Sequence, residues 1–243
     1  MAYQLKYSQY SERSILVEWP SVIDENILKD ILRFKNLIQN KYIKQEVELV
    51  SAYSSILIVY NYTIDFVNDA FLDLKALYEI EDSTYLIESK TFQIPVCYDV
   101  GFGIDLDAFS IEKNLSKPEI IRLHSQAIYT VYFIGFLPGF LYLGGLDSRL
   151  HLNRKTTPNL NVKKGSIAIG GEQTGIYPQD SPGGWHIIGN SPIELFNPKH
   201  HPPCFIKAGD KVKFQSISKS EYVKLQIDIK NSNFDLNALL IND

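Results

Sequence analysis

The sequence is poor in sulfur and has no excess of positive charge. Its 243 residues include two cysteines and one methionine, and the formal net charge at pH 7 is −4. Because Cys97 and Cys204 stand in no metal-ligand spacing, we expect two buried thiols in a reducing compartment, with a catalytic cysteine as the alternative. A general nucleic-acid binder would carry a basic face, so we expect no nucleic-acid partner.

Long hydrophobic runs are also missing. No apolar stretch reaches the ~18 residues of a membrane helix, and the opening MAYQLKYSQYSERS has no apolar signal region, so we expect a cytoplasmic protein without a membrane partner. No P-loop is present, and Gly101-Phe102-Gly103 lacks the remaining glycine of a dinucleotide turn. His200-His201 has no third ligand at a helpful spacing. No metal site is therefore expected, and no nucleotide site of these types.

The first ninety residues alternate between strand and helix patterns. Strands or amphipathic helices are expected at 14–19, 24–39, 47–50, 55–60, 67–78 and 91–98. Thr63 is a candidate cap for the second helix. The resulting order β-α-β-β-α-β is that of a ferredoxin-like unit. We predict an α+β domain over residues 1–90, with a boundary between 85 and 100.

From residue 91 the chain changes to short strands separated by glycine and proline. Ser116 with Glu119, and Ser218 with Glu221, have the spacing of capping boxes that open two helices. The closely spaced short strands predict a β-barrel or sandwich over residues 91–225. Residues 226–243 have no clear periodicity and are expected to form a tail of uncertain structure.

Two glycine-rich segments also contain large aromatic residues. They are GFLPGFLYLGGL at 135–146 and GGEQTGIYPQDSPGGWHIIG at 170–189. Glycine lets a backbone approach a ligand closely, proline holds a loop rigid, and aromatic rings supply apolar walls. The combination predicts a preformed pocket or an interface. Tight barrel corners plugged by aromatic rings are the alternative, and composition alone does not separate the two.

The same segments resemble the PxpB/KipI family, whose members include the B subunits of 5-oxoprolinases and proteins similar to the first subunit of allophanate hydrolase. The similarity covers nearly the whole chain and includes RLHS at 122–125. It is strongest where the family's order and spacing are kept by Gln173-Thr174-Gly175, Tyr177-Pro178 and Ser181-Pro182-Gly183-Gly184-Trp185. The chain departs from the family at Asp99-Val100, within a Tyr-Gly-Gly-Glu-type turn, and at Leu141, in the place of a proline.

The resemblance implies a ferredoxin-like N-terminal domain followed by a cyclophilin-like β-barrel domain. It also implies one component, inactive alone, of an ATP-dependent enzyme that hydrolyses 5-oxoproline to glutamate. The expected partners are a homologous C subunit, in a heterodimer or heterotetramer, and an A subunit that uses the ATP, so this chain would bind no cofactor. The alternatives are an inhibitor of a sensor histidine kinase and a component related to urea carboxylase or allophanate hydrolase.

The implied reaction, opening of a lactam ring, suggests roles for several residues of this chain. The reaction needs an activated carbonyl, a positioned water and a proton for the leaving nitrogen. The catalytic candidates are His124, Glu172, Gln173 and Tyr177, with a hydrogen-bonded structural role as the equal alternative for His124. The substrate-binding candidates are Arg149, Arg154, Gly175, Ser181, Gly183, Gly184 and Trp185. The candidate walls of a pocket or interface are Phe136, Pro138, Gly139 and Phe140.

Overall fold

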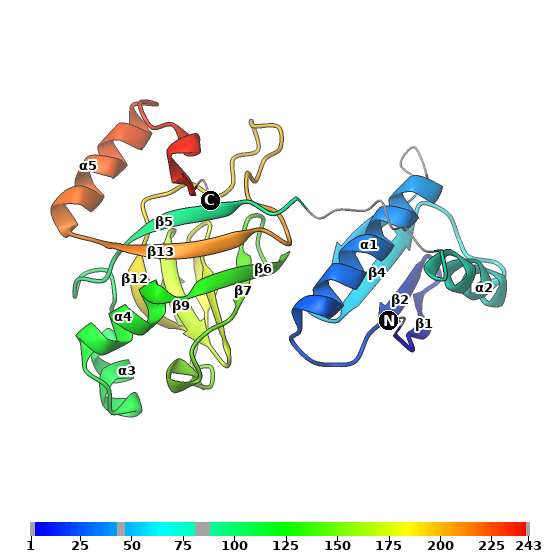
Figure 1. Ribbon diagram of the computed structural model, residues 1–243, viewed down its shortest axis with the longest axis horizontal. Helices are drawn as coiled ribbons and strands as arrows, with labels where there is room; N and C mark the ends of the chain where they lie inside the picture. Colours follow the sequence, from blue (N-terminus) through cyan, green and yellow to red (C-terminus); the bar gives the residue numbers. More distant parts are fainter. Residues whose placement is uncertain (1–2, 43–46, 81–87, 242–243) are drawn as a thin grey trace. The chain divides into compact units, whose positions relative to one another are not determined.

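A computed structural model describes residues 3–42, 47–80 and 88–241 (Figure 1). The chain divides into two compact units, Met1–Glu88 and Ser89–Asp243, and both contain helices and strands. Each unit buries an apolar core of its own. Among the described residues, no helix combines the length and the apolar character needed to cross a lipid bilayer.

The described part of the first unit is an antiparallel sheet with two helices on one face. Its strands β1 (Lys6–Ser11), β2 (Ser14–Glu18), β3 (Val47–Ser51) and β4 (Ser55–Tyr60) pair in the order β1-β2-β4-β3. Helices α1 (Glu25–Lys41) and α2 (Val67–Tyr78) share one core with the alternate inward residues of β2 and β4. Asp24 caps α1 by accepting from two backbone N–H groups.

Three sequence expectations for this unit are corrected. Strand β1 was not anticipated, because its residues are exposed or half-buried and show no apolar alternation. The cap of α2 is Phe66, which makes no side-chain bond, so the prediction of Thr63 as cap is wrong. The strand expected at 91–98 is β5 (Thr91–Cys97), and it pairs within the second unit. The apolar pattern of a strand indicates which of its residues are buried, but it does not indicate which strands pair with it.

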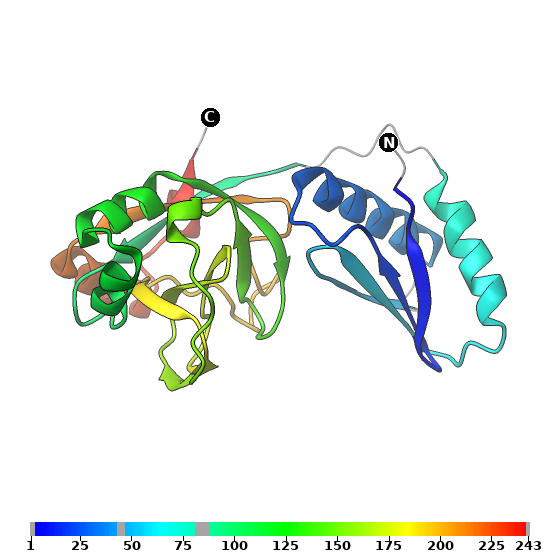
Figure 2. The same cartoon turned by 90° about the horizontal axis from the view of Figure 1, so that it is seen from below.

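The second unit is built on a closed β-barrel, seen from another side in Figure 2. The ring runs β12-β9-β10-β7-β6-β13-β5, and β5 returns to β12 at the pair Cys97 and Asn190. The bounds of these seven strands are β5 (Thr91–Cys97), β6 (Ile128–Ile134), β7 (Leu141–Gly144), β9 (Ser166–Gly170), β10 (Gln173–Ile176), β12 (His186–Asn190) and β13 (Lys211–Ile217). The pairing of β13 with β5 is parallel, whereas the other pairings in the ring are antiparallel.

Helices and a small two-stranded antiparallel sheet complete this unit. They are α3 (Leu106–Lys113), α4 (Lys117–Gln126), α5 (Lys219–Lys230), the 3-10 turns η1 (Ser148–Leu150) and η2 (Leu236–Leu239), and the paired strands β8 (Asn159–Val162) and β11 (Ser181–Gly183). Ser218 forms a complete capping box with Glu221, while Ser116 caps α4 in one direction only. The tail predicted from residue 226 begins inside α5, and β14 (Leu240–Ile241) pairs with β5.

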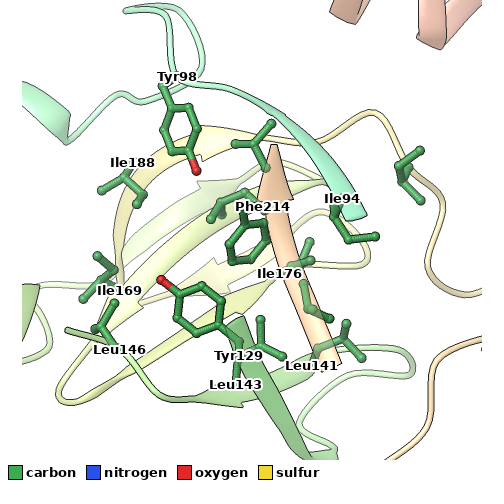
Figure 3. Close-up of a cluster of buried hydrophobic side chains, with 14 of the residues drawn as sticks. Ile94, Tyr98, Tyr129, Leu141, Leu143, Leu146, Ile169, Ile176, Ile188 and Phe214 are labelled. Atoms are coloured by element: carbon green, nitrogen blue, oxygen red, sulfur yellow. The ribbon is translucent and has the colours of Figure 1, made fainter. Parts of the chain in front are cut away.

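The barrel interior is filled by side chains. One buried cluster takes residues from every strand of the ring, and Figure 3 shows Ile94, Tyr129, Leu143, Ile169 and Phe214 among them. Side chains are one of the two ways in which the interior of a small barrel is filled, the other being a small ligand. A second, smaller cluster, here called the outer cluster, consists of Phe140, Val162, Ala168, Tyr177, Trp185 and Ile187. Ala168 lies between the inward-facing Ile167 and Ile169, so the outer cluster covers the outside of the barrel wall.

Candidate functional site

A cavity of about 370 Å³ opens over the outer cluster. It is lined by Phe136, Phe140, Tyr142, Arg154, Lys155, Pro158, Tyr177, Pro182, Gly183, Gly184 and Trp185. These residues come from the β6–β7 turn and β7, the loop before β8, the end of β10, and the segment from β11 to β12. Its volume is within the range of small-molecule pockets, which runs from about 300 to 1,000 Å³.

The apolar wall of the cavity is a set of aromatic rings packed around Phe140, edge to face or tilted. The Phe140 ring centroid lies 5.1 Å from that of Tyr177 and 5.6 Å from that of Trp185, at interplanar angles of 90° and 85°. The Tyr142 ring lies 4.8 Å from Phe140 and 5.9 Å from Trp185. Such arrangements stabilise aromatic pairs beyond their buried area, so the rings hold one another in fixed orientations.

Glycines allow the rings to lie against the backbone. A Cβ atom added at Gly183 would lie 2.2 Å from the Tyr177 hydroxyl oxygen, and one added at Gly170 would lie 2.6 Å from the Trp185 ring. Burial raises the pKa of Tyr177, and the Trp185 backbone N–H opposes this only in part. The phenol is therefore neutral at pH 7, which makes Tyr177 a wall and a possible hydrogen-bond partner and gives it no role as a base.

We predict that Gly183→Ala lowers the free energy of unfolding by about 1–3 kcal/mol, since the added methyl group overpacks against Tyr177. Urea denaturation of the purified chain measures the change. Gly184→Ala is the matched control, because its Cβ would meet only the Lys155 carbonyl oxygen at 3.6 Å. Equal losses in the two variants would show that the close approach of Tyr177 does not matter.

Two cations lie at the cavity, and they differ in their partners. The Lys155 ammonium lies 2.5 Å from Asp105 Oδ1, and Asp105 Oδ2 accepts from the Ile187 N–H at 2.7 Å. The Lys155 N–H in turn donates to the Gly184 carbonyl oxygen at 2.7 Å. These three contacts, here called the Asp105 clamp, hold the loop before β8 against the start of β12 and neutralise the lysine.

Arg154 has no such neutralising partner. Its guanidinium carbon lies 5.5 Å from the centroid of the Trp185 ring, a distance typical of a cation–π contact. Within the described part of the chain, no carboxylate forms an ion pair with it. The cavity therefore combines aromatic walls with one guanidinium that is available to a carboxylate.

The structure brings nearly half of the predicted site residues together at the cavity. The cavity is lined by the predicted residues Phe136, Phe140, Arg154, Tyr177, Gly183, Gly184 and Trp185. Gly139, with φ of +85°, and Gly175, whose added Cβ would lie 3.0 Å from the Phe140 ring, support the wall from behind. Pro138 is exposed on the same turn and does not line the cavity.

Besides His124, four other candidates lie outside the cavity lining. Glu172 is exposed in the β9–β10 turn, and the Ser181 hydroxyl donates to the neighbouring Pro182 carbonyl oxygen. The Arg149 guanidinium pairs with Asp147 at 2.7 Å and with Glu119 at 3.5 Å, so its charge is already compensated. The Gln173 Oε1 atom is buried and accepts no hydrogen bond from the described residues.

His124 is fully buried in the barrel core. Its Nδ1 lies 2.8 Å from the Tyr98 hydroxyl, and its Nε2 lies 2.9 Å from Thr174 Oγ1. Because the Thr174 hydroxyl donates to the Ala168 carbonyl oxygen, it accepts from the His124 Nε2–H, and Tyr98 donates to Nδ1. Burial lowers the pKa of His124 to about 3, so the ring is neutral at pH 7. The geometry supports the structural role and not the catalytic one.

Sequence reasoning missed Asp105 and Lys155. The structure places Lys155 at the cavity, in the Asp105 clamp. No local signal could have found Asp105, because it lies 82 residues before its hydrogen-bond partner Ile187. Tyr142 and Pro182 belong to the two glycine-rich segments, so their composition already pointed to them.

Comparison with known proteins gives the family. Residues 5–206 match the model of the carboxyltransferase domain, subdomain C and D. The B subunit of the Bacillus subtilis (strain 168) 5-oxoprolinase is 32% identical over 233 residues, which covers 91% of this chain and 97% of that protein. The B subunit of the Escherichia coli O157:H7 5-oxoprolinase is 44% identical over 127 residues, which covers 52% of this chain and 58% of that protein.

A solved structure of the Kluyveromyces lactis urea amidolyase matches 96% of this chain and 16% of its own, with a TM-score of 0.81. Its sequence identity of 20% makes this a likeness of fold alone. The family model spans most of this sequence. The match to the Bacillus subtilis protein covers nearly the full length of both proteins. This chain therefore belongs to the carboxyltransferase domain family, subdomain C and D, and 5-oxoprolinase B subunits are among its relatives.

Proposed function

We propose that this chain is the B subunit of an ATP-dependent 5-oxoprolinase and that its cavity holds 5-oxoproline during hydrolysis to glutamate. The named B subunits of Bacillus subtilis and Escherichia coli support the assignment. The observation that carries it is the aromatic cavity with Arg154 at its wall, where no carboxylate of the described residues forms an ion pair with the guanidinium. 5-Oxoproline is a small flat ring with one carboxylate, which suits an aromatic wall and a guanidinium fork.

Ring opening adds water to the lactam carbonyl carbon, breaks the C–N bond and delivers a proton to the leaving nitrogen. Among the described residues that line the cavity, no side chain is a carboxylate or an imidazole. Burial raises the pKa of both tyrosines at the cavity, and Lys155 is paired with Asp105. This chain would therefore bind and orient the ring, with the base and the ATP-dependent activation supplied by partners. We propose an A subunit that uses ATP and a homologous C subunit, with no cofactor bound here.

The fold details are part of the same proposal. In the first unit, β2, α1, β3, β4 and α2 follow the β-α-β-β-α order of a ferredoxin-like fold. Strand β1 would occupy, beside β2, the position of that fold's final strand, which makes the unit a permuted ferredoxin-like domain. We propose that the barrel is of the cyclophilin-like type.

The experiment is reconstitution of glutamate release from 5-oxoproline and ATP with A and C subunits of a B. subtilis-type enzyme. We expect turnover only when this chain is added, and none from the chain alone. Turnover by this chain alone would contradict the proposal that partner subunits supply the base and the activation. No turnover when this chain is combined with the A and C subunits would contradict its assignment as a B subunit. Carboxyl transfer to urea is the second candidate, favoured by the family match. Carboxylated urea, formed when urea and a carboxyl donor replace 5-oxoproline in the assay, would identify it.

A further inference from the structure

Phe136 has an unusual backbone conformation. Its φ is +65°, and the other non-glycine residues with positive φ in the described chain are Asn114 and Ser232. The Leu137 N–H donates to the Gly135 carbonyl oxygen at 2.7 Å, so Phe136 is the centre of a three-residue γ-turn. A left-handed centre makes this turn strained for a bulky residue, whereas glycine would adopt it without penalty.

The rest of the β6–β7 turn is built without such strain. The residues 137–140 form a β-turn in which the Phe140 N–H donates to the Leu137 carbonyl oxygen at 3.0 Å. Pro138 takes the second position and Gly139, with φ of +85°, takes the third, which are the residues that a type II turn favours. The turn chemistry therefore gives a reason for Pro138 and Gly139 but none for a phenylalanine at 136.

Core packing gives no reason either. The Phe136 side chain is 64% exposed, and its main aromatic contact is an edge-to-face one with Phe140 at 5.7 Å. The ring nevertheless lines the cavity, beside the wall formed by Phe140 and Trp185. In the empty cavity, the strained backbone and the exposed apolar ring of Phe136 both cost free energy. A ligand that covers the ring removes the part of this cost that comes from exposure to water.

We propose that Phe136 is a ligand-contacting wall residue, held in its strained turn so that it covers the apolar ring of a cyclic carboxylate in the cavity. The inference rests on the proposed function for the identity of that carboxylate, since Arg154 supplies the matching charge. In this role, Phe136 makes the cavity prefer a cyclic carboxylate to an open-chain one. An open-chain ligand would cover less of the phenylalanine ring and leave more of it exposed to water.

The test compares Phe136→Gly with Phe136→Ala in the full chain. Both remove the ring, but only glycine also removes the strain. We expect Phe136→Gly to raise Tm by about 2–4 °C and Phe136→Ala to leave Tm near that of the unmodified chain. In calorimetric titrations with benzoate and with 5-oxoproline, both variants should bind at least about tenfold more weakly. Ser232→Gly, at another positive φ, is the control that should change no binding.

The outcomes separate this inference from the proposed function. Binding of benzoate and 5-oxoproline by Phe136→Gly as tight as in the unmodified chain would overturn it. A lower Tm in Phe136→Gly would also overturn it, because the residue would then support the fold. If the reconstituted complex turns over no 5-oxoproline, the proposed function fails, and the benzoate titrations still decide the role of Phe136. No saturable binding of either ligand by the unmodified chain also overturns the inference.

Discussion

Replacing His124 with phenylalanine is expected to lower the free energy of unfolding by about 2–4 kcal/mol at pH 7.5. The new ring keeps the stacked contact with Phe214, which has a centroid distance of 4.6 Å in the native chain. It cannot accept from the Tyr98 hydroxyl or donate to Thr174, so two buried hydrogen bonds are lost. The Tyr98 hydroxyl is left in an apolar core without its partner, and this is the larger part of the cost.

The same substitution is expected to change how stability depends on pH. The pKa of His124 is about 3 in the folded chain, against ~6.5 when unfolded, so the unfolded state binds an extra proton between these values. Stability from this group is therefore complete above pH 6.5 and falls by about 1.4 kcal/mol for each unit below it. The unmodified chain should lose about 2 kcal/mol between pH 6.5 and 5, and His124→Phe should lack this loss.

Urea unfolding at pH 7.5, 6.5, 5.5 and 5.0 measures both effects. The stability difference between the two chains should shrink as the pH falls. His200→Phe is the matched control, because His200 is exposed and its replacement should leave the curve unchanged. Parallel pH profiles for the unmodified chain and His124→Phe would mean that His124 is not buried as a neutral ring.

Replacing Arg154 with methionine is expected to lower kcat/KM of the reconstituted 5-oxoprolinase by roughly 10- to 100-fold, mainly through KM. The change removes the unpaired guanidinium at the cavity and keeps an unbranched apolar stem over Trp185. Because Arg154 is exposed and makes no ion pair with the described residues, the free energy of unfolding should change by less than about 0.5 kcal/mol. Arg154→Lys should recover part of the activity, since it restores the charge without the fork.

Arg149→Met is the control for Arg154. The sequence offered both arginines as carboxylate partners, but the structure pairs Arg149 with Asp147 and Glu119. We expect near-normal kcat/KM for Arg149→Met in the same glutamate-release assay. If Arg149→Met loses activity and Arg154→Met keeps it, the substrate carboxylate does not bind at this cavity.

The sequence predicts much of the barrel because its strands carry strong local patterns. Ile167 and Ile169 alternate with Ala168, and this period of two directly separates the barrel interior from the outer cluster. The glycines and aromatic rings of 170–189 likewise indicate close packing around a pocket. Local patterns therefore give the elements and the general location of the site.

Long-range placement is what the sequence does not contain. His124 and Arg154 both look like catalytic or binding residues, but one is enclosed in the core and the other is at the cavity. Gln173 and Thr174 are neighbours on β10, and only the direction of the strand's pleat sends Thr174 toward His124. Asp105 joins the site through a partner far along the chain. Such placement depends on tertiary contacts that no local period encodes.

The parallel pairing of β5 with β13 has a consequence for the time course of synthesis. Thr91 pairs with Lys211, a separation of 120 residues, so β5 lacks this neighbour until most of the chain has been made. At a synthesis rate of about 5–20 residues per second, that wait is roughly 6–24 s. During this interval β5, which is rich in apolar residues, has unpaired backbone groups along the edge that later pairs with β13. Ribosome-bound chaperones therefore have a defined segment to protect, and truncated chains that end before β13 are the ones expected to aggregate.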